Sequence, residues 1–315
     1  MSDPRTADRT TVLAAFAAIY FVWGSTYLGI KVAIETIPPL MMIGARSLLA
    51  GAILFGWSRL QGSPAPSRSH WLVTAVTGCL LFAGGQGALA WAETRVPSGV
   101  AALIIATIPI WMTILGTLRG TNGGLRPRTL IGLATGLLGM ALLAEPSQLL
   151  AGAPVDPLGA CVLLGAALSW SIGSIMLGDA RLPDSSVMVS GMNLLTGGAL
   201  LVVLSLAGGE RVTLGSISQR SLLSLIYLIV FGSVITFVAY TWLMRRVASE
   251  SVATYAFVNP IVAVFFGWLL GGESISPRIV ASAILLVTGV AAIVTAGHGS
   301  RSPAAVARAL EGSEG

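Results

Sequence analysis

Residues 221–243 read SLLSLIYLIVFGSVITFVAYTWL, a run of 23 residues without a charged side chain. The hydrocarbon core of a bilayer is about 30 Å thick, and about 20 residues of α-helix cross it. A run of this length and composition therefore predicts a transmembrane segment. It must be a helix, because no water is available inside the bilayer to bond exposed peptide groups.

Nine further apolar segments are separated by short stretches rich in proline, glycine and asparagine. No stretch between them is long enough to form a soluble domain. The ten segments lie near residues 12–34, 39–58, 71–92, 98–118, 129–144, 158–178, 186–207, 221–243, 251–271 and 279–296. We therefore predict an all-α integral membrane protein with ten transmembrane helices. The first segment exceeds the apolar core of a signal peptide, so we expect it to be retained.

The composition of the chain supports the same class. Of its 315 residues, 55% are hydrophobic and only 10% are charged, whereas about 25% of the residues of a soluble domain are charged. This composition excludes a soluble enzyme, a nucleic-acid-binding protein and a disordered protein. The two cysteines, Cys79 and Cys161, and the two histidines, His70 and His298, do not have the spacing of a metal site.

The residues that intramembrane chemistry would need are also missing from the sequence. It contains no G-x-x-x-x-G-K-[ST] phosphate loop, and no histidine-based constellation falls at membrane depth. We therefore expect no enzymatic activity, no catalytic residue, no metal and no cofactor. The expected partners are the lipid bilayer and a small-molecule substrate, and not nucleic acid.

The arginines predict which helix ends face the cytoplasm, because cytoplasmic loops are enriched in lysine and arginine. With the N-terminus inside, twelve of the 18 basic residues lie in inner segments, and Lys31 and Arg46 lie within spans. The four in outer segments are Arg95, Arg211, Arg220 and Arg278. We therefore predict a multi-pass protein of the cytoplasmic (inner) membrane with both termini in the cytoplasm.

The two halves of the chain resemble each other weakly. The tetrapeptides RVPS at 95–98 and RVAS at 246–249 are 151 residues apart, and the same offset relates Trp91 to Trp242. An offset of 147 relates Arg46 to Asn193. Each half contains five predicted spans. Since five is odd, the second half enters the membrane from the opposite side, which gives two inverted repeats.

We accordingly divide the chain into a cytoplasmic segment 1–11, a first repeat 12–145, a second repeat 155–296 and a flexible cytoplasmic tail 297–315. Inverted repeats are a known route to alternating access, with the substrate near the midplane between the repeats. The alternative is that duplication merely built a large helical bundle.

Several short motifs occur in order along the chain: VWGSTY at 22–27, PP at 38–39 before GAR at 44–46, VPSG at 96–99, NP at 259–260 and GGE at 271–273. In this order and spacing the chain resembles the drug/metabolite transporter superfamily, in particular its EamA-type branch. One departure is that Thr121 and Asn122 occupy the place in the first half that Glu273 has in the second.

The resemblance implies a ten-helix transporter that usually exports metabolites or amino acids and is often proton-coupled or exchanging. We predict a secondary active transporter that exports amino-acid-like or amphiphilic metabolites by alternating access around a central cavity. The alternatives are a multidrug or toxic-compound efflux carrier, a channel and a structural membrane protein. The sequence leaves open the substrate, the coupling ion, the direction and the oligomeric state.

A stripe of three side chains runs down the first predicted helix, where Trp23, Tyr27 and Lys31 recur every four residues. An aromatic wall with a cation at its outer end suits an amphiphilic metabolite with an anionic group. The alternative is that the aromatic residues serve packing or lie at the membrane interface.

Charged residues near the outer side of the first three spans are further candidates, because charge inside a bilayer is costly. Lys31 or Arg46 could hold a substrate carboxylate, and Glu35 or Glu93 could exchange a proton. The alternative is a structural ion-pair network, which Arg95 would join.

The remaining substrate-binding candidates are polar or aromatic residues at midspan. In the first half they are Gln86, which lies among glycines, and Trp111. Trp170, Tyr255 and Asn259 are the candidates in the second half, where Tyr240 and Trp242 are further counterparts of first-half residues.

Two prolines, Pro109 and Pro260, each remove a backbone donor near the middle of a helix and predict a kink that shapes the cavity. Small residues along the fifth span, from Gly132 to Gly139, and Ser282 and Gly289 in the tenth, predict close helix packing. The sequence does not decide whether these faces meet each other or a second protomer.

Overall fold

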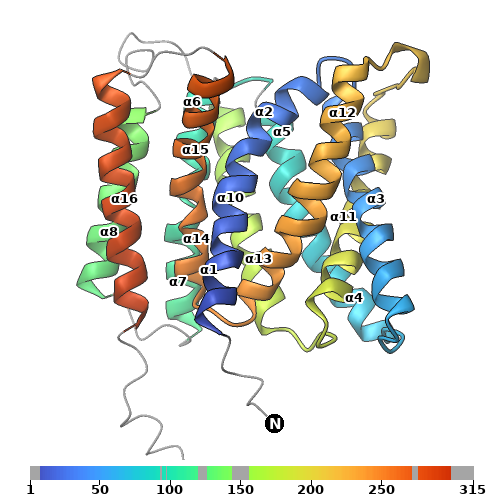
Figure 1. Ribbon diagram of the computed structural model, residues 1–315, viewed down its shortest axis with the longest axis horizontal. Helices are drawn as coiled ribbons and strands as arrows, with labels where there is room; N and C mark the ends of the chain where they lie inside the picture. Colours follow the sequence, from blue (N-terminus) through green and yellow to red (C-terminus); the bar gives the residue numbers. More distant parts are fainter. Residues whose placement is uncertain are drawn as a thin grey trace, which may run out of the picture.

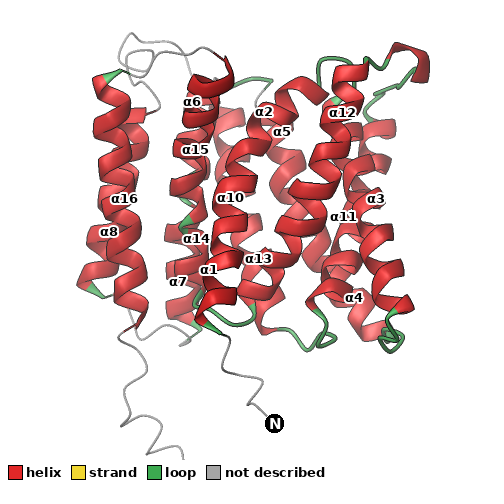
Figure 2. Cartoon of the chain, viewed as in Figure 1, coloured by secondary structure: helices red, strands yellow, loops and turns green. Residues whose placement is uncertain are grey.

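The computed structural model describes residues 8–92, 94–96, 98–119, 126–143, 156–271 and 276–298. Within these ranges the chain forms helices and no strand (Figures 1 and 2). The α-helices are α1 Arg9–Ala17, α2 Trp23–Ala33, α3 Pro39–Leu60, α4 Arg68–Gly78, α5 Ala88–Ala92, α6 Ser98–Ile105, α7 Ile108–Leu118, α8 Pro127–Leu143, α10 Pro157–Asp179, α11 Ser186–Ala207, α12 Gln219–Tyr227, α13 Thr236–Met244, α14 Ser249–Ala253, α15 Tyr255–Gly271 and α16 Pro277–His298.

Nine helical segments of the described chain are long and apolar enough to cross a membrane. The predicted fifth span corresponds to α8, an apolar helix of 17 described residues. The described residues thus form nine candidate spans and one shorter apolar helix, as expected of an integral membrane helical protein, and the count of ten spans stays a prediction. Figure 1 shows the helices side by side, with α1 beginning and α16 ending on the same side of the molecule, here called the Arg9 side.

Three long helices contain a π-helical segment in which the backbone is wound more loosely. These segments are η1 Ala18–Val22 between α1 and α2, η2 Cys79–Gly87 between α4 and α5, and η4 Leu228–Ile235 between α12 and α13. A π-helical turn leaves backbone carbonyl groups without their usual partners and is frequent at functional sites. Apolar length alone predicts a regular helix across each of these spans.

Two predicted spans are interrupted. Residues 106–107 separate α6 from α7, directly before Pro109, which occupies the first turn of α7. This is the break that a proline without a donor produces. In the ninth span the interruption is at Thr254, between α14 and α15, and Pro260 lies inside α15. The break at Thr254 thus lies six residues before Pro260, and the kink predicted at Pro260 stays a prediction.

Glycines bring α3 and α11 into direct backbone contact. A Cβ atom on Gly44 would lie 3.3 Å from the Gly198 carbonyl oxygen, and one on Gly51 would lie 3.0 Å from the Gly191 carbonyl oxygen. The residue numbers rise along one helix as they fall along the other, so the two helices are antiparallel. No larger side chain fits at these four positions without displacing backbone atoms.

The small-residue faces of α8 and α16 pack against each other. A Cβ atom on Gly132 would lie 2.8 Å from the Gly289 carbonyl oxygen, and Ser282 Oγ donates to the Gly139 carbonyl oxygen at 2.6 Å. This answers the question that the sequence left open, because these faces meet within one chain. The pair forms one edge of the molecule in Figure 1.

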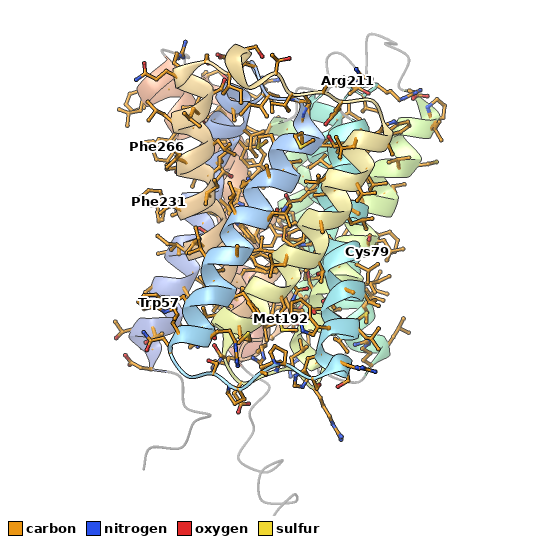
Figure 3. The ribbon with its side chains drawn as sticks, turned by 90° about the vertical axis from the view of Figure 1, so that its right-hand side faces the viewer. Trp57, Cys79, Met192, Arg211, Phe231 and Phe266 are labelled. Carbon is orange, nitrogen blue, oxygen red and sulfur yellow. The ribbon has the colours of Figure 1, made fainter. Side chains whose placement is uncertain are left out.

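Large apolar side chains occur both inside and on the outer surface, as expected where lipid replaces water. Met192 is buried, whereas Trp57 is 59% exposed and Phe231 43% exposed. Figure 3 shows Trp57 and Phe231 at the outer edge of the bundle. A groove on this surface, between α3 and the η4–α13 segment, is lined by apolar residues such as Ile53 and Val238. Its lining is predominantly apolar, which suits acyl chains.

Candidate functional site

Four aromatic rings from four different spans meet inside the bundle. They belong to Trp23 of α2, Trp170 of α10, Tyr240 of α13 and Tyr255 of α15; we call them the aromatic cluster. The Trp23 ring centroid lies 5.1 Å from that of Tyr240, 5.1 Å from that of Tyr255 and 6.2 Å from that of Trp170. Trp170, Tyr240 and Tyr255 are buried, and Trp23 is half-buried.

The cluster unites three residues predicted as substrate-binding with one that was marked only as a counterpart. Tyr240 lies 5.9 Å from Trp170 and 5.8 Å from Tyr255, measured between ring centroids, so it lies at the centre of the group. The sequence indicated Tyr240 only as a counterpart of first-half residues, because periodicity within one helix does not show which other rings it contacts.

Hydrogen bonds fix the rings in place. The Tyr240 hydroxyl is hydrogen-bonded to Ser174 Oγ, and Ser174 Oγ donates to the Trp170 carbonyl oxygen at 2.6 Å. Trp23 Nε1 donates to the Gly232 carbonyl oxygen at 3.0 Å. Gly232 belongs to η4, so the loosely wound segment supplies the acceptor that orients Trp23.

Glycines of η2 make room for the cluster. A Cβ atom on Gly85 would lie 2.9 Å from Cε3 of Trp170, and one on Gly84 would collide with Ser169 Oγ. The glycines predicted to let a helix or ligand approach therefore admit α10. Gln86 beside them is half-buried, and its amide forms no hydrogen bond within the described chain.

The predicted stripe on the first span becomes more exposed with distance from the cluster. Trp23 is half-buried, Tyr27 is 53% exposed, and Lys31 and Glu35 are exposed. Tyr27 lies near enough to Tyr255 to interact with it electrostatically. The stripe thus leads from the aromatic cluster toward the side opposite to Arg9. Neither Lys31 nor Glu35 forms an ion pair with a described residue.

Asn259 is buried and ties two irregular segments together. In the amide orientation that satisfies its neighbours, its Nδ2 donates to the carbonyl oxygens of Ile19 and Tyr20, each at 3.1 Å. Tyr20 also shares a hydrogen bond of 2.6 Å with Thr254 Oγ1, at the break between α14 and α15. The Asn259 amide therefore holds η1 against the ninth span, and it also donates to the carbonyl oxygen of Tyr255 at 3.2 Å.

The other predicted residues are not members of the aromatic cluster, although Trp111 packs against the same hydrophobic core. Trp111 of α7 is half-buried, and its Nε1 is buried without an acceptor among described residues. Arg46 of α3 is buried and forms no ion pair there, and Glu93 lies outside the described residues. The structure therefore does not bring Arg46 and Glu35 into one ion-pair network. The described residues hold no group of His, Cys, Asp and Glu suited to a metal.

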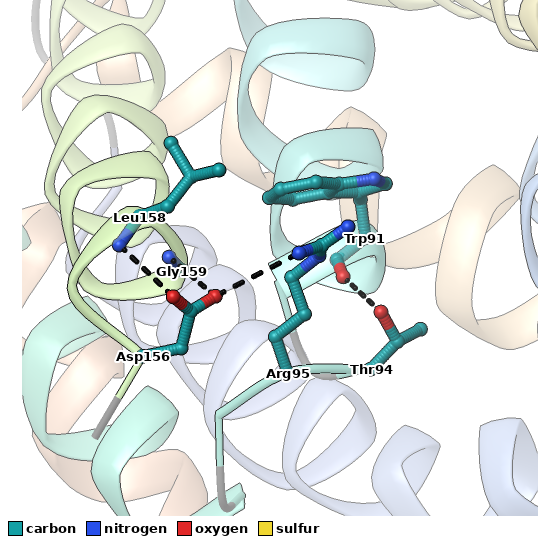
Figure 4. Close-up of polar contacts among 6 residues, drawn as sticks. All are labelled: Trp91, Thr94, Arg95, Asp156, Leu158 and Gly159. Atoms are coloured by element: carbon teal, nitrogen blue, oxygen red, sulfur yellow. Dashed lines mark hydrogen bonds and ion pairs between the residues drawn. The ribbon is translucent and has the colours of Figure 1, made fainter. Parts of the chain in front are cut away.

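Ion pairs between described residues occur at helix ends. Figure 4 shows Arg95 between the Trp91 ring, 4.4 Å from its centroid, and the Asp156 carboxylate at 3.9 Å. Asp156 also accepts from the first backbone N–H groups of α10, those of Leu158 and Gly159. On the Arg9 side, Arg119 pairs with Asp179 at 2.8 Å.

The Trp91–Arg95 arrangement recurs in the second half. The Arg246 guanidinium lies over the Trp242 ring, 4.8 Å from its centroid. In Figure 1, α5 ends on the side opposite to Arg9 and α13 ends on the Arg9 side. The two cation–π pairs therefore lie at opposite ends of the bundle.

A bundle of apolar helices around an internal aromatic cluster is compatible with a membrane transporter. The model of the EamA-like transporter family matches residues 9–144 and again 157–295. This chain belongs to that family.

Known relatives agree with this class. An Escherichia coli K12 protein named as an uncharacterized inner membrane transporter, YedA, is 36% identical over 285 residues, which cover 88% of this chain and 90% of that protein. A probable amino-acid metabolite efflux pump of Salmonella typhimurium is 27% identical over 286 residues, covering 86% of this chain and 91% of the pump. The chain is thus a membrane transporter of the EamA-like family.

A solved structure shares the fold. A chain described only as "Crystal structure of protein" superposes with a TM-score of 0.77 over 94% of this chain and 100% of its own length, at 19% sequence identity. At this identity the similarity concerns the fold alone.

Proposed function

We propose that the chain is a secondary active transporter that exports small organic metabolites across the cytoplasmic membrane by alternating access. The aromatic cluster is the observation that carries this proposal. Trp23 comes from the first half of the chain and the other three rings from the second, so the cluster lies where the halves meet. Ligand sites are mostly apolar with a few placed polar groups, and this combination suits an amphiphilic compound.

The glycine contacts support an inverted repeat. With the offset of 147, Gly44 corresponds to Gly191 and Gly51 to Gly198. A two-fold operation that exchanges the two halves maps the Gly44–Gly198 contact onto the Gly191–Gly51 contact. Both contacts occur. Contacts that exchange in this way are expected of a two-fold relation between the halves.

The edge pair α8 and α16 gives the same result independently. Here the offset is 150, which relates Gly132 to Ser282 and Gly139 to Gly289. Exchange converts the Gly132–Gly289 contact into the Ser282–Gly139 contact, and both occur. We therefore infer ten spans, with α8 as the fifth, in repeats 12–145 and 155–296. We also infer that both termini are cytoplasmic.

Export is the direction supported by relatives, because two of them are named probable amino-acid metabolite efflux pumps. Amino-acid-like or amphiphilic metabolites are accordingly the substrates to test first. Coupling to protons or to a counter-substrate belongs to the same test.

Flux measured in proteoliposomes tests this function. Purified protein is reconstituted and assayed with a panel of labelled amino acids, amphiphilic metabolites and cationic dyes, with and without a pH gradient. We expect saturable flux of one metabolite class, abolished by Trp23→Ala and retained by Trp23→Phe in equally folded protein. Saturable flux of the dyes alone would indicate a multidrug carrier, and unselective leak would contradict the transporter proposal.

A further inference from the structure

The one basic side chain that is buried within the described spans is Arg46, which is 6% exposed. It lies in α3, about 10 Å inward from Pro39 at 1.5 Å per residue. One face of α3, with Gly44 and Gly51, is pressed against α11. The helix also packs against η2 and η4, which border the aromatic cluster through Gly85 and Gly232.

The Arg46 guanidinium has no partner in the described chain. Its Nε is buried without a hydrogen bond, and no hydrogen bond or ion pair joins the group to a described residue. Another buried donor without a partner, Ser233 Oγ, lies in η4. All described acids lie at helix ends or in connections: Asp8, Glu35, Asp156, Asp179, Asp184, Glu210 and Glu250.

Glu210 is the acid that is hydrogen-bonded to α3, and its carboxylate already accepts hydrogen bonds from other groups. It accepts from the backbone N–H groups of Leu40 and Met41, at 3.3 and 2.9 Å, and from Ser205 Oγ at 2.7 Å. It therefore serves the first turn of α3 and not Arg46.

The residue at the equivalent position in the second half, Asn193, has hydrogen-bond partners within the chain. Asn193 is fully buried, accepts from Thr77 Oγ1 at 2.6 Å and donates to the Val189 carbonyl oxygen at 3.0 Å. The first half places a cation where the second places a neutral amide that is hydrogen-bonded through both its oxygen and its nitrogen. Removing an unpaired charge from water is strongly unfavourable, so such a group in a membrane span indicates a functional partner.

We propose that Arg46 binds the carboxylate of the transported substrate, whose apolar body lies against the aromatic cluster. The substrate class is then an amphiphilic carboxylate, including amino acids with large apolar side chains. A planar guanidinium can hold a carboxylate by two parallel hydrogen bonds. This inference rests on the proposed function and adds the substrate class to it.

Paired probes that differ only in charge test this proposal. Proteoliposomes are assayed with phenylalanine and phenylalaninamide, and with leucine and leucinamide, because each amide keeps the body and the amine of its acid. We expect wild-type protein to transport the acids saturably and Arg46→Gln to lose at least tenfold of that flux. Amide flux should change less than twofold. Arg46→Lys should retain part of the acid flux, and Arg59→Gln, on the exposed end of the same helix, should behave as wild type.

Several results would overturn the role of Arg46. One is equal loss of acid and amide flux in Arg46→Gln, which indicates a structural role, and another is selective loss of acid flux in Lys31→Gln but not in Arg46→Gln. If Arg46→Gln does not fold, titration of wild-type tryptophan fluorescence decides, and equal affinity for acid and amide refutes the proposal. Saturable flux of amides but not acids would refute this inference alone. Absence of saturable flux with every compound would refute the proposed function.

Discussion

At the scale of single residues, the aromatic cluster is stabilised by contacts between its own rings. Tyr240 contacts Trp23, Trp170 and Tyr255, and its hydroxyl reaches Ser174. The ring and the hydroxyl can be separated experimentally, because phenylalanine keeps the former and removes the latter.

We expect Tyr240→Phe to destabilise the protein by about 1–3 kcal/mol, since a buried hydrogen bond is lost. Flux should remain within about threefold of wild type, because Ser174 Oγ still donates to the Trp170 carbonyl oxygen. Tyr240→Ala removes the ring contacts and should reduce flux at least tenfold. Thermal unfolding in detergent and flux of the same preparations check both. Equal flux in Tyr240→Ala and wild type would place the substrate elsewhere.

At the scale of elements, close approach of helices depends on glycine at four positions of α3 and α11. If the halves are related by a two-fold axis, equivalent glycines should be equally sensitive. Gly56 offers a matched control on the same helix, since a Cβ atom there would meet nothing within 4 Å.

We expect Gly51→Ala and Gly198→Ala to destabilise the protein by similar amounts, about 1–3 kcal/mol each, because the added methyl group would overlap backbone atoms. Gly56→Ala should leave the melting temperature unchanged. The measurement is thermal unfolding followed by tryptophan fluorescence. A large effect at one glycine of the equivalent pair and none at the other would contradict the symmetric packing.

Much of the helix arrangement could be predicted from the sequence, because apolar length and turn residues determine where helices begin and end. Pro39 and Pro157 begin α3 and α10 within a residue or two of the expected starts. The π-helical segments and the break at Thr254 could not be predicted. They depend on tertiary partners such as Asn259 and Gly232, which come from distant spans.

The residues of the candidate site could be predicted from the sequence only in part. Trp23 was predicted from its spacing with Tyr27 and Lys31, and Trp170 and Tyr255 were predicted as counterparts in the second half. Tyr240 and the isolation of Arg46 depend on which helices are neighbours, and periodicity within one helix does not contain that information.

At the scale of the whole molecule, the Arg95–Trp91 and Arg246–Trp242 cation–π pairs lie at opposite ends of the bundle. Arg95 pairs with Asp156, which directly precedes α10, whereas Arg246 has no ion pair to Asp8, which directly precedes α1. Asp8 and Asp156 directly precede the two ranges matched by the family model. Alternating access predicts that the Asp8–Arg246 pair forms when the Arg95–Asp156 pair opens.

We expect Arg246→Asp to slow transport and Asp8→Arg combined with Arg246→Asp to restore it. An exposed ion pair contributes about 0.2–1 kcal/mol, so the change in rate should not exceed about fivefold. Arg95→Asp with Asp156→Arg should behave in the same way. The measurement is initial flux at several salt concentrations, because screening should reduce the effect. Additive losses in the double variants would mean that these residues do not pair during transport.

Trans-stimulated exchange in proteoliposomes tests the central claim, transport by alternating access, most directly. Vesicles are loaded with the labelled compound of highest flux, and its exit is timed with and without excess unlabelled compound outside. A carrier that reorients with substrate bound predicts exit accelerated several-fold by the external compound, in wild type and not in Trp23→Ala. Exit that is unaffected by the external compound and rises linearly with the internal concentration would contradict alternating access and indicate a channel.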